Sequence, residues 1–222
     1  MTTYEDLTSY VYWREEPEET APTVNVGWLG RGSRFEVGEP EPGLVEALLE
    51  LASFHRMHAT RGWHGCELCG PEGTYPVRVP FERASGGEVT LGSAEIHVPG
   101  ADGVVYAAPN LVCHYVERHH YRPPAEFVRA VFAEAGARAH AWDEVKRSLP
   151  VGTSVRGVVR SYHGSGLWFD LDDFPDVAAT VPNELYGPDG AGADREHVRF
   201  RVPTEAVVVG HAEQGRRVIL RV

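Results

Sequence analysis

The last third of the chain is a series of short apolar segments separated by turn residues, and this pattern constrains the fold most. It begins after Pro150-Val151-Gly152. Five short strands are predicted, at Ser154–Ser161, Gly166–Leu171, Ala178–Val181, Glu205–Val209 and Arg217–Val222. The outer strands of an open sheet would expose unpaired backbone groups, and closure into a barrel removes those edges. We therefore expect an all-β, five-stranded barrel over Pro150–Val222.

Three runs within this barrel segment match a known pattern. Val151–Val159 has the pattern Gly-x-x-Val-x-Gly-x-Val, which starts at its second residue. Gly164–Leu171 contains glycines and aromatic residues followed by Asp-Leu. Gly210–Leu220 has two arginines shortly before its final leucine. Together they resemble the OB-fold of the ribosomal S-one type. The resemblance implies binding of single-stranded RNA, with aromatic side chains stacking on bases and basic side chains meeting phosphates. The matching positions are Arg160, Tyr162, His163, Trp168, Phe169, Arg199 and Arg201.

The charge of the chain disfavours broad nucleic-acid binding. The formal net charge is -11, from 21 basic and 32 acidic residues, and such a charge repels a phosphate backbone. Val151–Val222 contains no lysine, and Asp170-Leu171-Asp172-Asp173 is acidic beside the expected groove. Strand side chains alternate between two faces, so at least one of Trp168 and Phe169 belongs to the core. RNA binding is therefore an alternative to a barrel that contacts protein or is purely structural.

The residues before Pro150 predict a domain of mixed helices and strands. Apolar residues recur at helical spacing from Gly43 to about Met57, and Asn110 can cap a short helix that runs to about His120. Two further helices are predicted, from Pro124 to Gly136 and from Ala137 to Leu149. Strands are predicted at Val24–Leu29, Glu88–Val98 and Val104–Tyr106. The expected division is an α+β domain over Met1–Leu149 and the barrel over Pro150–Val222.

Cys66 and Cys69 lie two residues apart in a glycine-rich segment, and they are the sharpest local signal in the chain. Two thiolates at this spacing can bind one Zn²⁺ ion, and a tetrahedral structural site needs two further ligands. His114 and His119 have four residues between them, which is within the usual spacing for such a pair. We expect these four side chains to hold a structural zinc ion. The alternative ligands are His64, Cys113 and His120.

Helical geometry constrains which of these residues can share one ion. On an ideal helix His114 and His119 point about 140° apart, so both can bind the same ion only where the helix frays before Pro123. Cys113 points about 100° away from His114 and is expected in the core.

A second resemblance covers most of Met1–Ala135. Its matching runs are Asn25–Leu29 with Gly32, Thr60–His64 with Cys66 and Cys69, Leu91–Ile96, Tyr106–Pro109, and His114–Val116 with His119, Tyr121 and Pro123-Pro124. These runs resemble a bacterial family of unknown function. The family brings no activity with it, so the resemblance supports the shared Cys and His site and does not imply a reaction.

The metal ligands favour a structural role over a catalytic one. A catalytic zinc usually has His or carboxylate ligands and an open position, whereas a cysteine-rich site is more often structural. Glu67, Glu95 and Glu117 are candidate hidden acids or bases, but their spacing does not demand catalysis. We expect a non-enzymatic, zinc-stabilised binding protein whose acidity suits a basic protein partner, as in an immunity protein that neutralises a toxin. An RNA-associated regulator and a metal-dependent enzyme are the alternatives.

The expected compartment is the cytoplasm. Met1–Asp6 lacks the basic region and apolar run of a signal peptide, and no apolar stretch approaches the ~20 residues of a membrane span. The chain has three cysteines, and its Cys-x-x-Cys pattern favours metal chemistry over a disulfide framework. We expect no membrane partner, and no motif implies an organic cofactor.

Overall fold

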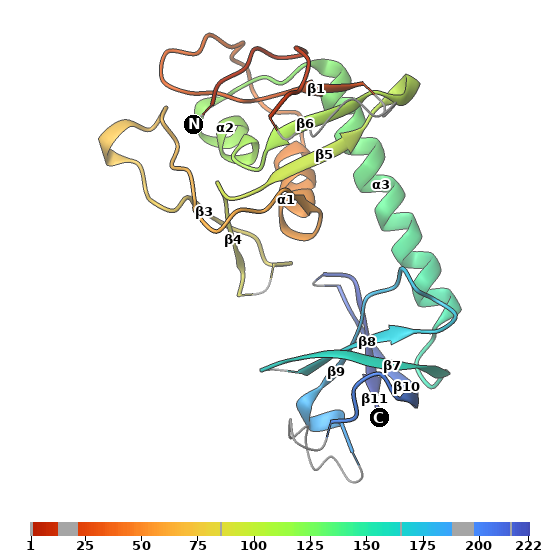
Figure 1. The fold of residues 1–222 in the computed structure, drawn as a ribbon. Helices are drawn as coiled ribbons and strands as arrows, with labels where there is room; N and C mark the ends of the chain where they lie inside the picture. Colours follow the sequence, from red (N-terminus) through yellow and green to blue (C-terminus); the bar gives the residue numbers. More distant parts are fainter. Residues whose placement is uncertain (1, 13–21, 85, 165, 188–197, 214) are drawn as a thin grey trace. The chain divides into compact units, whose positions relative to one another are not determined.

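A computed structural model of the 222-residue chain describes residues 2–12, 22–84, 86–164, 166–187, 198–213 and 215–222. The chain divides into two units, Met1–Arg138 and Ala139–Val222 (Figure 1). The first unit mixes helices and strands, and the second is built mainly from strands, so the fold is of the mixed α+β class. None of the helices in the described ranges combines the length and the apolar character needed to cross a bilayer.

Short strands and helices alternate along the first unit. Its strands are β1 (Thr23–Asn25), β2 (Arg56–Met57), β3 (Arg78–Pro80), β4 (Glu88–Thr90), β5 (Glu95–Pro99) and β6 (Val105–Pro109). Its helices are α1 (Leu44–Phe54), α2 (Val112–His119) and the first part of α3 (Ala125–Ser148), with 3-10 turns at Gly70–Glu72 and Ala101–Gly103. The helices predicted near 43–57 and 110–120 are confirmed, and β5 forms an antiparallel hairpin with β6.

One predicted strand, Glu88–Val98, is instead two strands in different sheets. β4 pairs with β3 and β5 pairs with β6, and Gly92 lies between them with a φ of 96°. Glycine adopts such an angle readily and other residues avoid it. A Cβ atom at Gly92 would also overlap the carbonyl oxygen of His64. Gly92 therefore turns the chain between the two sheets and lets the segment before Cys66 approach closely.

The larger sheet of the first unit has the strand order β1-β6-β5-β2, in which β1 and β6 are parallel and the other pairs antiparallel. Side chains alternate along β5. Ile96 and Val98 lie in the apolar core with α1, α2 and the first turns of α3, whereas Glu95 and His97 point to the opposite face. Figure 1 shows α1 next to β5 of this sheet.

The opposite face of this sheet is covered by aromatic residues of the N-terminal region. Tyr10, Trp28 and Ala107 form a separate small core there, and the Trp28 Nε1–H group donates to the Ala107 carbonyl at 2.9 Å. Asn25 is fully buried and fixes the N-terminal segment, because its Nδ2 group donates to the Ser9 carbonyl at 2.9 Å and to Thr8 Oγ1 at 3.1 Å. The sheet thus has two buried faces, one aliphatic and one aromatic.

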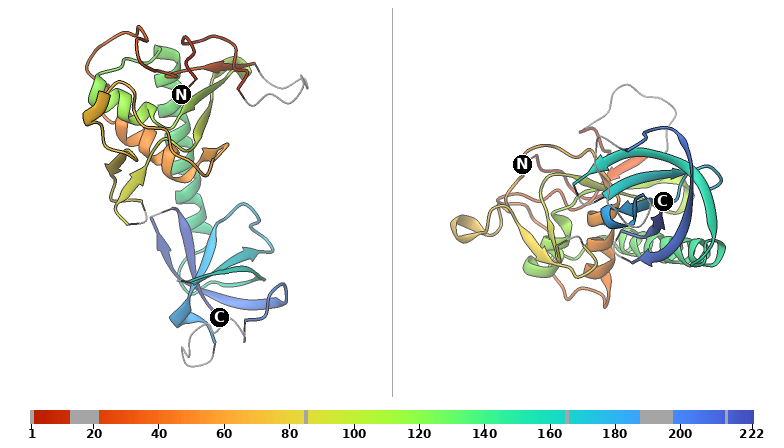
Figure 2. Two further views of the ribbon diagram at one scale, coloured as in Figure 1. Left: turned by 60° about the vertical axis from the view of Figure 1, so that its left-hand side comes forward. Right: turned by 90° about the horizontal axis from the view of Figure 1, so that it is seen from below.

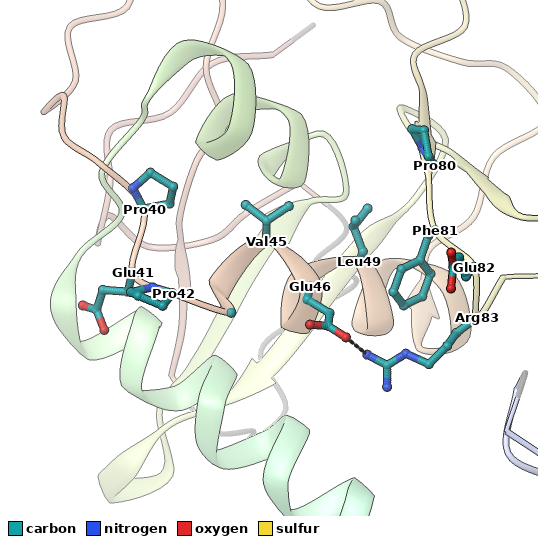
Figure 3. A pocket seen from close by; sticks show the side chains of 11 residues that line it. Pro40, Glu41, Pro42, Val45, Glu46, Leu49, Pro80, Phe81, Glu82 and Arg83 are labelled. Atoms are coloured by element: carbon teal, nitrogen blue, oxygen red, sulfur yellow. Dashed lines mark hydrogen bonds and ion pairs between the residues drawn. The ribbon is translucent and has the colours of Figure 1, made fainter.

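Arg83 joins the loop after β3 to α1, beside a pocket (Figure 3). One guanidinium nitrogen, Nη2, lies 2.6 Å from Glu46 Oε1, and the other, Nη1, lies 3.3 Å from Glu50 Oε2. Glu46 is exposed, whereas the Glu50 side chain is only 4% exposed. The pocket wall combines this ion pair with prolines and apolar side chains, and that mixture does not select one class of ligand.

Helix α3 is a single helix of 24 residues, so the predicted break at Gly136 is wrong. One exposed glycine within a helix costs only about 1 kcal/mol, which the surrounding good helix formers offset. The side chains of Trp142, Val145 and Leu149 pack into the core of the second unit. The division between the two units accordingly falls within α3, between Arg138 and Ala139.

The second unit is built around a closed barrel of five strands (Figure 2). They are β7 (Ser154–His163), β8 (Gly166–Leu171), β9 (Ala179–Pro182), β10 (Pro203–Ala212) and β11 (Arg217–Arg221), with a 3-10 turn at Asn183–Leu185. Around the barrel the order is β7-β8-β9-β11-β10 and back to β7, and only the β9–β11 pair is parallel. Burial alternates along β8, so Leu167, Phe169 and Leu171 fill the barrel.

Candidate metal centre

The predicted metal ligands come from two elements of the first unit, the glycine-rich segment around Cys66 and helix α2. Backbone contacts hold the segment in place, because the His64 N–H group donates to the Gly92 carbonyl at 2.7 Å. Asn110 supports the same region, although not as the predicted helix cap. Its Oδ1 atom accepts the Gly92 N–H group at 2.7 Å, and α2 begins after Leu111 without a side-chain cap.

Four donor atoms converge at this point. His119 Nε2 lies 3.2 Å from both Cys66 Sγ and Cys69 Sγ, and His114 Nε2 lies 3.2 Å from Cys69 Sγ. The ligand atoms of these four residues all lie within 4.8 Å of one another. Two ligands of a tetrahedral zinc ion, one sulfur and one nitrogen, are about 3.6 Å apart. The four side chains are therefore close enough to hold a metal ion.

The end of α2 explains how two histidines at this spacing face the same sulfur. His119 is the last residue of α2, and His120 takes a left-handed conformation with a φ of 52°. The rings of His114 and His119 are 5.1 Å apart, centroid to centroid. Both histidines thus lie within α2, the second as its last residue, and both imidazoles still reach the same sulfur atom.

Burial favours the neutral form of three of the donor groups, Cys66, His114 and His119. Desolvation raises the pKa of the Cys66 thiol to about 11, and it lowers the pKa of His114 to about 4, with His119 adding a smaller effect. The pKa of His119 is also lowered, mainly by burial. Neutral imidazoles are ready to donate to a metal ion, whereas the thiols must lose their protons when the ion enters.

The donor set fits a closed structural zinc site. Two thiolates and two imidazoles are one of the ligand sets that structural zinc sites use. Cys66 and His114 are buried, while Cys69 and His119 are half-buried, so the site lies just beneath the surface.

The alternative ligands lie elsewhere. Cys113 is 1% exposed and belongs to the apolar core. His120 is exposed, and its ring lies 3.8 Å from Glu39. His64 lines a separate small cavity together with Trp28 and Glu95.

A second group of potential metal ligands was not predicted from the sequence. His58, Glu95 and His97 bring their ligand atoms within 4.8 Å of one another on the aromatic face of the sheet. Glu95 had been singled out as a hidden acid or base, but neither histidine had. The available signal was the alternation Glu95-Ile96-His97-Val98, which puts two ionisable side chains on one face of a strand.

The barrel brings together only part of the predicted nucleic-acid contacts. Trp168 is half-buried on the outer face of β8, and the guanidinium carbons of Arg160 and Arg217 each lie 5.8 Å from its ring centroid. The ring of His163 lies 6.4 Å from the same ring. Arg217 was not among the predicted contacts. It lies on β11, and only the pairing of β11 with β9 brings it near Trp168 on β8.

The remaining predicted contacts have other environments. Phe169 is 2% exposed inside the barrel and cannot stack on a base. Tyr162 is partly buried against the same core. Arg199 and Arg201 are exposed in the segment before β10, where their backbone N–H groups donate to Tyr186 and Val159.

Solved structures show only distant similarity to this chain. The intact alpha subunit of aIF2 from Pyrococcus abyssi is 19% identical over 32% of this chain and 27% of that one, with a TM-score of 0.28. RNase R of Mycoplasma genitalium is 12% identical over 44% of this chain and 17% of that one, with a TM-score of 0.30. A multidomain protein with nucleic acid binding domains from Streptococcus pneumoniae is 9% identical over 60% of this chain and 35% of that one, with a TM-score of 0.26. The chain spans well under half of each of these proteins, and such low scores carry no argument about function.

The first unit has a clear family assignment. No curated protein matches the chain. The family model described as Domain of unknown function (DUF7919) matches residues 2–132, which include all four candidate ligands of the metal centre. Because this match covers more than half of the 222 residues, the chain belongs to the DUF7919 family.

Proposed function

We propose that this chain is a non-enzymatic binding protein in which a zinc ion stabilises the first unit and the barrel binds single-stranded RNA. The observation that carries the RNA assignment is the position of Trp168 on the outside of the barrel, with the guanidinium carbons of two arginines each 5.8 Å from its ring centroid. Zinc binding rests on the convergence of Cys66, Cys69, His114 and His119.

The order of the barrel strands supports an OB-type fold. Numbered along the barrel segment, the strands run 1-2-3-5-4 and then return to 1, with strands 3 and 5 parallel. This is a five-stranded Greek-key arrangement of the OB type, whose second and third strands form the usual surface for oligonucleotides. Trp168 lies on the second of these strands, β8, and pairs with Thr180 on the third, β9.

The surroundings of Trp168 suit a base and a phosphate. An indole ring offers a flat surface for any base, and stacking on one aromatic ring is worth about 1–3 kcal/mol. Arg160 and Arg217 each bring a positive charge to 5.8 Å from the centroid of this ring, where it can meet a nucleic-acid backbone.

Acidic residues on the same strand limit this interaction. Arg160 Nη1 lies 3.5 Å from Asp170 Oδ1, so part of its charge is already compensated. Asp172 and Asp173 are exposed immediately after β8. We therefore expect an affinity that is modest and falls steeply as salt increases.

Fluorescence anisotropy of a labelled single-stranded oligoribonucleotide, with the full chain at fixed salt, tests the RNA assignment. Trp168→Ala is expected to weaken binding roughly 5- to 150-fold, which corresponds to the loss of one stacked base. Arg160→Gln combined with Arg217→Gln is expected to weaken binding and to flatten its dependence on salt.

Arg147→Gln is the matched control, because it removes an exposed arginine from α3 and leaves the barrel strands unchanged. It should leave the affinity close to that of the wild-type protein. The assignment is abandoned if the wild-type protein shows no saturable binding, or if Trp168→Ala binds as well as the wild type.

The net charge of -11 supports the second candidate, a protein that binds a basic partner as an immunity protein does. A pull-down from lysate with and without nuclease separates the two functions. RNA-mediated partners disappear after nuclease treatment, whereas a directly bound basic protein stays. Loss of every partner after nuclease would exclude the immunity hypothesis.

A further inference from the structure

Glu95 and His97 form the centre of a second polar cluster, on the face of the sheet opposite the aliphatic core. They are two residues apart on β5, so their side chains project in the same direction. His97 Nε2 lies 2.9 Å from Glu95 Oε2. The Glu95 side chain is 4% exposed and the His97 side chain 19% exposed. A carboxylate is therefore held almost without water beside an imidazole.

His58 reaches the same carboxylate from the neighbouring strand. It follows β2, whose Met57 pairs with Glu95, and its Nδ1 atom lies 3.3 Å from Glu95 Oε2. The φ of His58 is 47°, a left-handed angle that is uncommon for residues other than glycine and costs of order 1 kcal/mol. Such strain persists where the surrounding structure demands it, and here it accompanies the approach of the imidazole to Glu95.

Tyr10 completes the immediate surroundings of Glu95. Its hydroxyl group donates to Glu95 Oε2 at 2.7 Å, and burial together with this carboxylate raises the pKa of Tyr10. The other carboxylate oxygen, Oε1, is buried and has no hydrogen-bond partner among the residues that the structure describes. A buried oxygen of this kind usually accepts from a water molecule or binds an ion.

A small cavity of about 40 Å³ lies beside the cluster. Its wall includes His58 and Glu95 as well as Trp28, Thr60 and His64. This volume is enough for one or more water molecules. The three ligand atoms thus lie next to a space that a water molecule can fill.

We infer that His58, Glu95 and His97 bind a divalent transition-metal ion, with a water molecule from the adjacent cavity as a further ligand. Two imidazoles and one carboxylate are the ligand set of open sites for Zn²⁺ and Fe²⁺. The Tyr10 hydroxyl group would act from outside this ligand set, by fixing the orientation of the carboxylate. The site differs in kind from the Cys66 centre, because it has no sulfur ligand and keeps an open position.

Titration of chelator-treated full-length protein with Co²⁺ tests this inference. The wild-type protein is expected to bind two ions, of which only the one at the cysteine site produces thiolate-to-cobalt charge-transfer absorption. His97→Gln and His58→Gln should each bind one ion and keep that absorption, which also reports that the protein is folded. Tyr10→Phe should still bind two ions but bind the second one roughly 10- to 100-fold more weakly.

Two further variants make the outcomes distinguishable. Cys69→Ser should bind one ion without charge-transfer absorption, so a failure of the cysteine site and a failure of the second site give different results. His140→Gln, which removes an exposed histidine from α3, should bind two ions like the wild type. The inference is overturned if the wild type binds only the ion at the cysteine site, or if His97→Gln and His58→Gln both still bind two ions. In that case Glu95 holds its neighbours by hydrogen bonds alone.

Discussion

His114 and His119 meet at a single sulfur atom, because the Nε2 atom of each lies 3.2 Å from Cys69 Sγ. Cys66 contacts only the second of these imidazoles, also at 3.2 Å. Cys69 is therefore the residue that contacts both imidazoles, whereas Cys66 connects the glycine-rich segment to α2 through His119.

Cys69→Ser is expected to remove one zinc ion per chain and to lower the stability of the first unit. A bound ion adds about 4 kcal/mol when the free zinc concentration is about 1,000 times Kd, and the variant loses that contribution. Metal analysis and thermal unfolding with and without a chelator measure both effects. Cys113→Ala changes a core cysteine and should keep the ion. A Cys69→Ser protein with the zinc content and chelator response of the wild type would contradict the site.

Gly92→Ala is expected to destabilise the protein more than an alanine substitution at another left-handed glycine. The positive φ costs an alanine about 1–2 kcal/mol, and the added Cβ would also meet the His64 backbone. Gly32→Ala is the matched control, since its φ is 84° and a Cβ there meets nothing within 4 Å. Chemical denaturation should show the larger loss for Gly92→Ala, together with weaker zinc binding. Equal losses would show that the close approach is unimportant.

The sequence predicted those features that depend on local spacing. Cys66 and Cys69 are adjacent through one tight turn, and the barrel strands follow one another with regular alternation, so both patterns are visible in the linear chain. The alternation also placed Trp168 and Phe169 on opposite faces, and the structure puts Phe169 in the core.

Features that depend on pairing between distant strands could not be read in this way. His58 meets Glu95 only because β2 is hydrogen-bonded to β5, and Arg217 reaches Trp168 only through the order of the closed barrel. Gly136 predicted a break in a helix that continues, because local propensity is weaker than the packing of Trp142 and Leu149 beyond it.

Arg83→Met is expected to lower the free energy of unfolding by about 1–3 kcal/mol, because it removes a charged partner from the buried Glu50 carboxylate. Glu50→Gln in the same protein should restore part of the loss, and the four proteins form a double-mutant cycle. The control is Arg78→Met, whose partner Glu88 is 47% exposed. That pair should contribute no more than about 1 kcal/mol. A coupling energy near zero for Arg83 and Glu50 would contradict the role assigned to the ion pair.

Asp6 should make the stability of the first unit depend on pH. Its carboxylate accepts the Gly27 N–H group and the Tyr121 hydroxyl group, each at 2.8 Å, but burial outweighs these contacts and raises the pKa of Asp6. A carboxyl group with a raised folded-state pKa favours folding below its unfolded value of about 3.9, and this contribution is lost as the pH rises through the folded value. Asp6→Asn removes that dependence.

The free energy of unfolding of the wild-type protein, minus that of Asp6→Asn, is therefore expected to fall as the pH increases from about 3 to 7. Chemical denaturation across this range measures the difference, in which the other acidic groups cancel because both proteins share them. Glu5→Gln removes an exposed carboxyl group from the adjacent position and serves as the control. A difference that stays constant, or that rises with pH, would mean that the contacts with Gly27 and Tyr121 outweigh the cost of burying the charge.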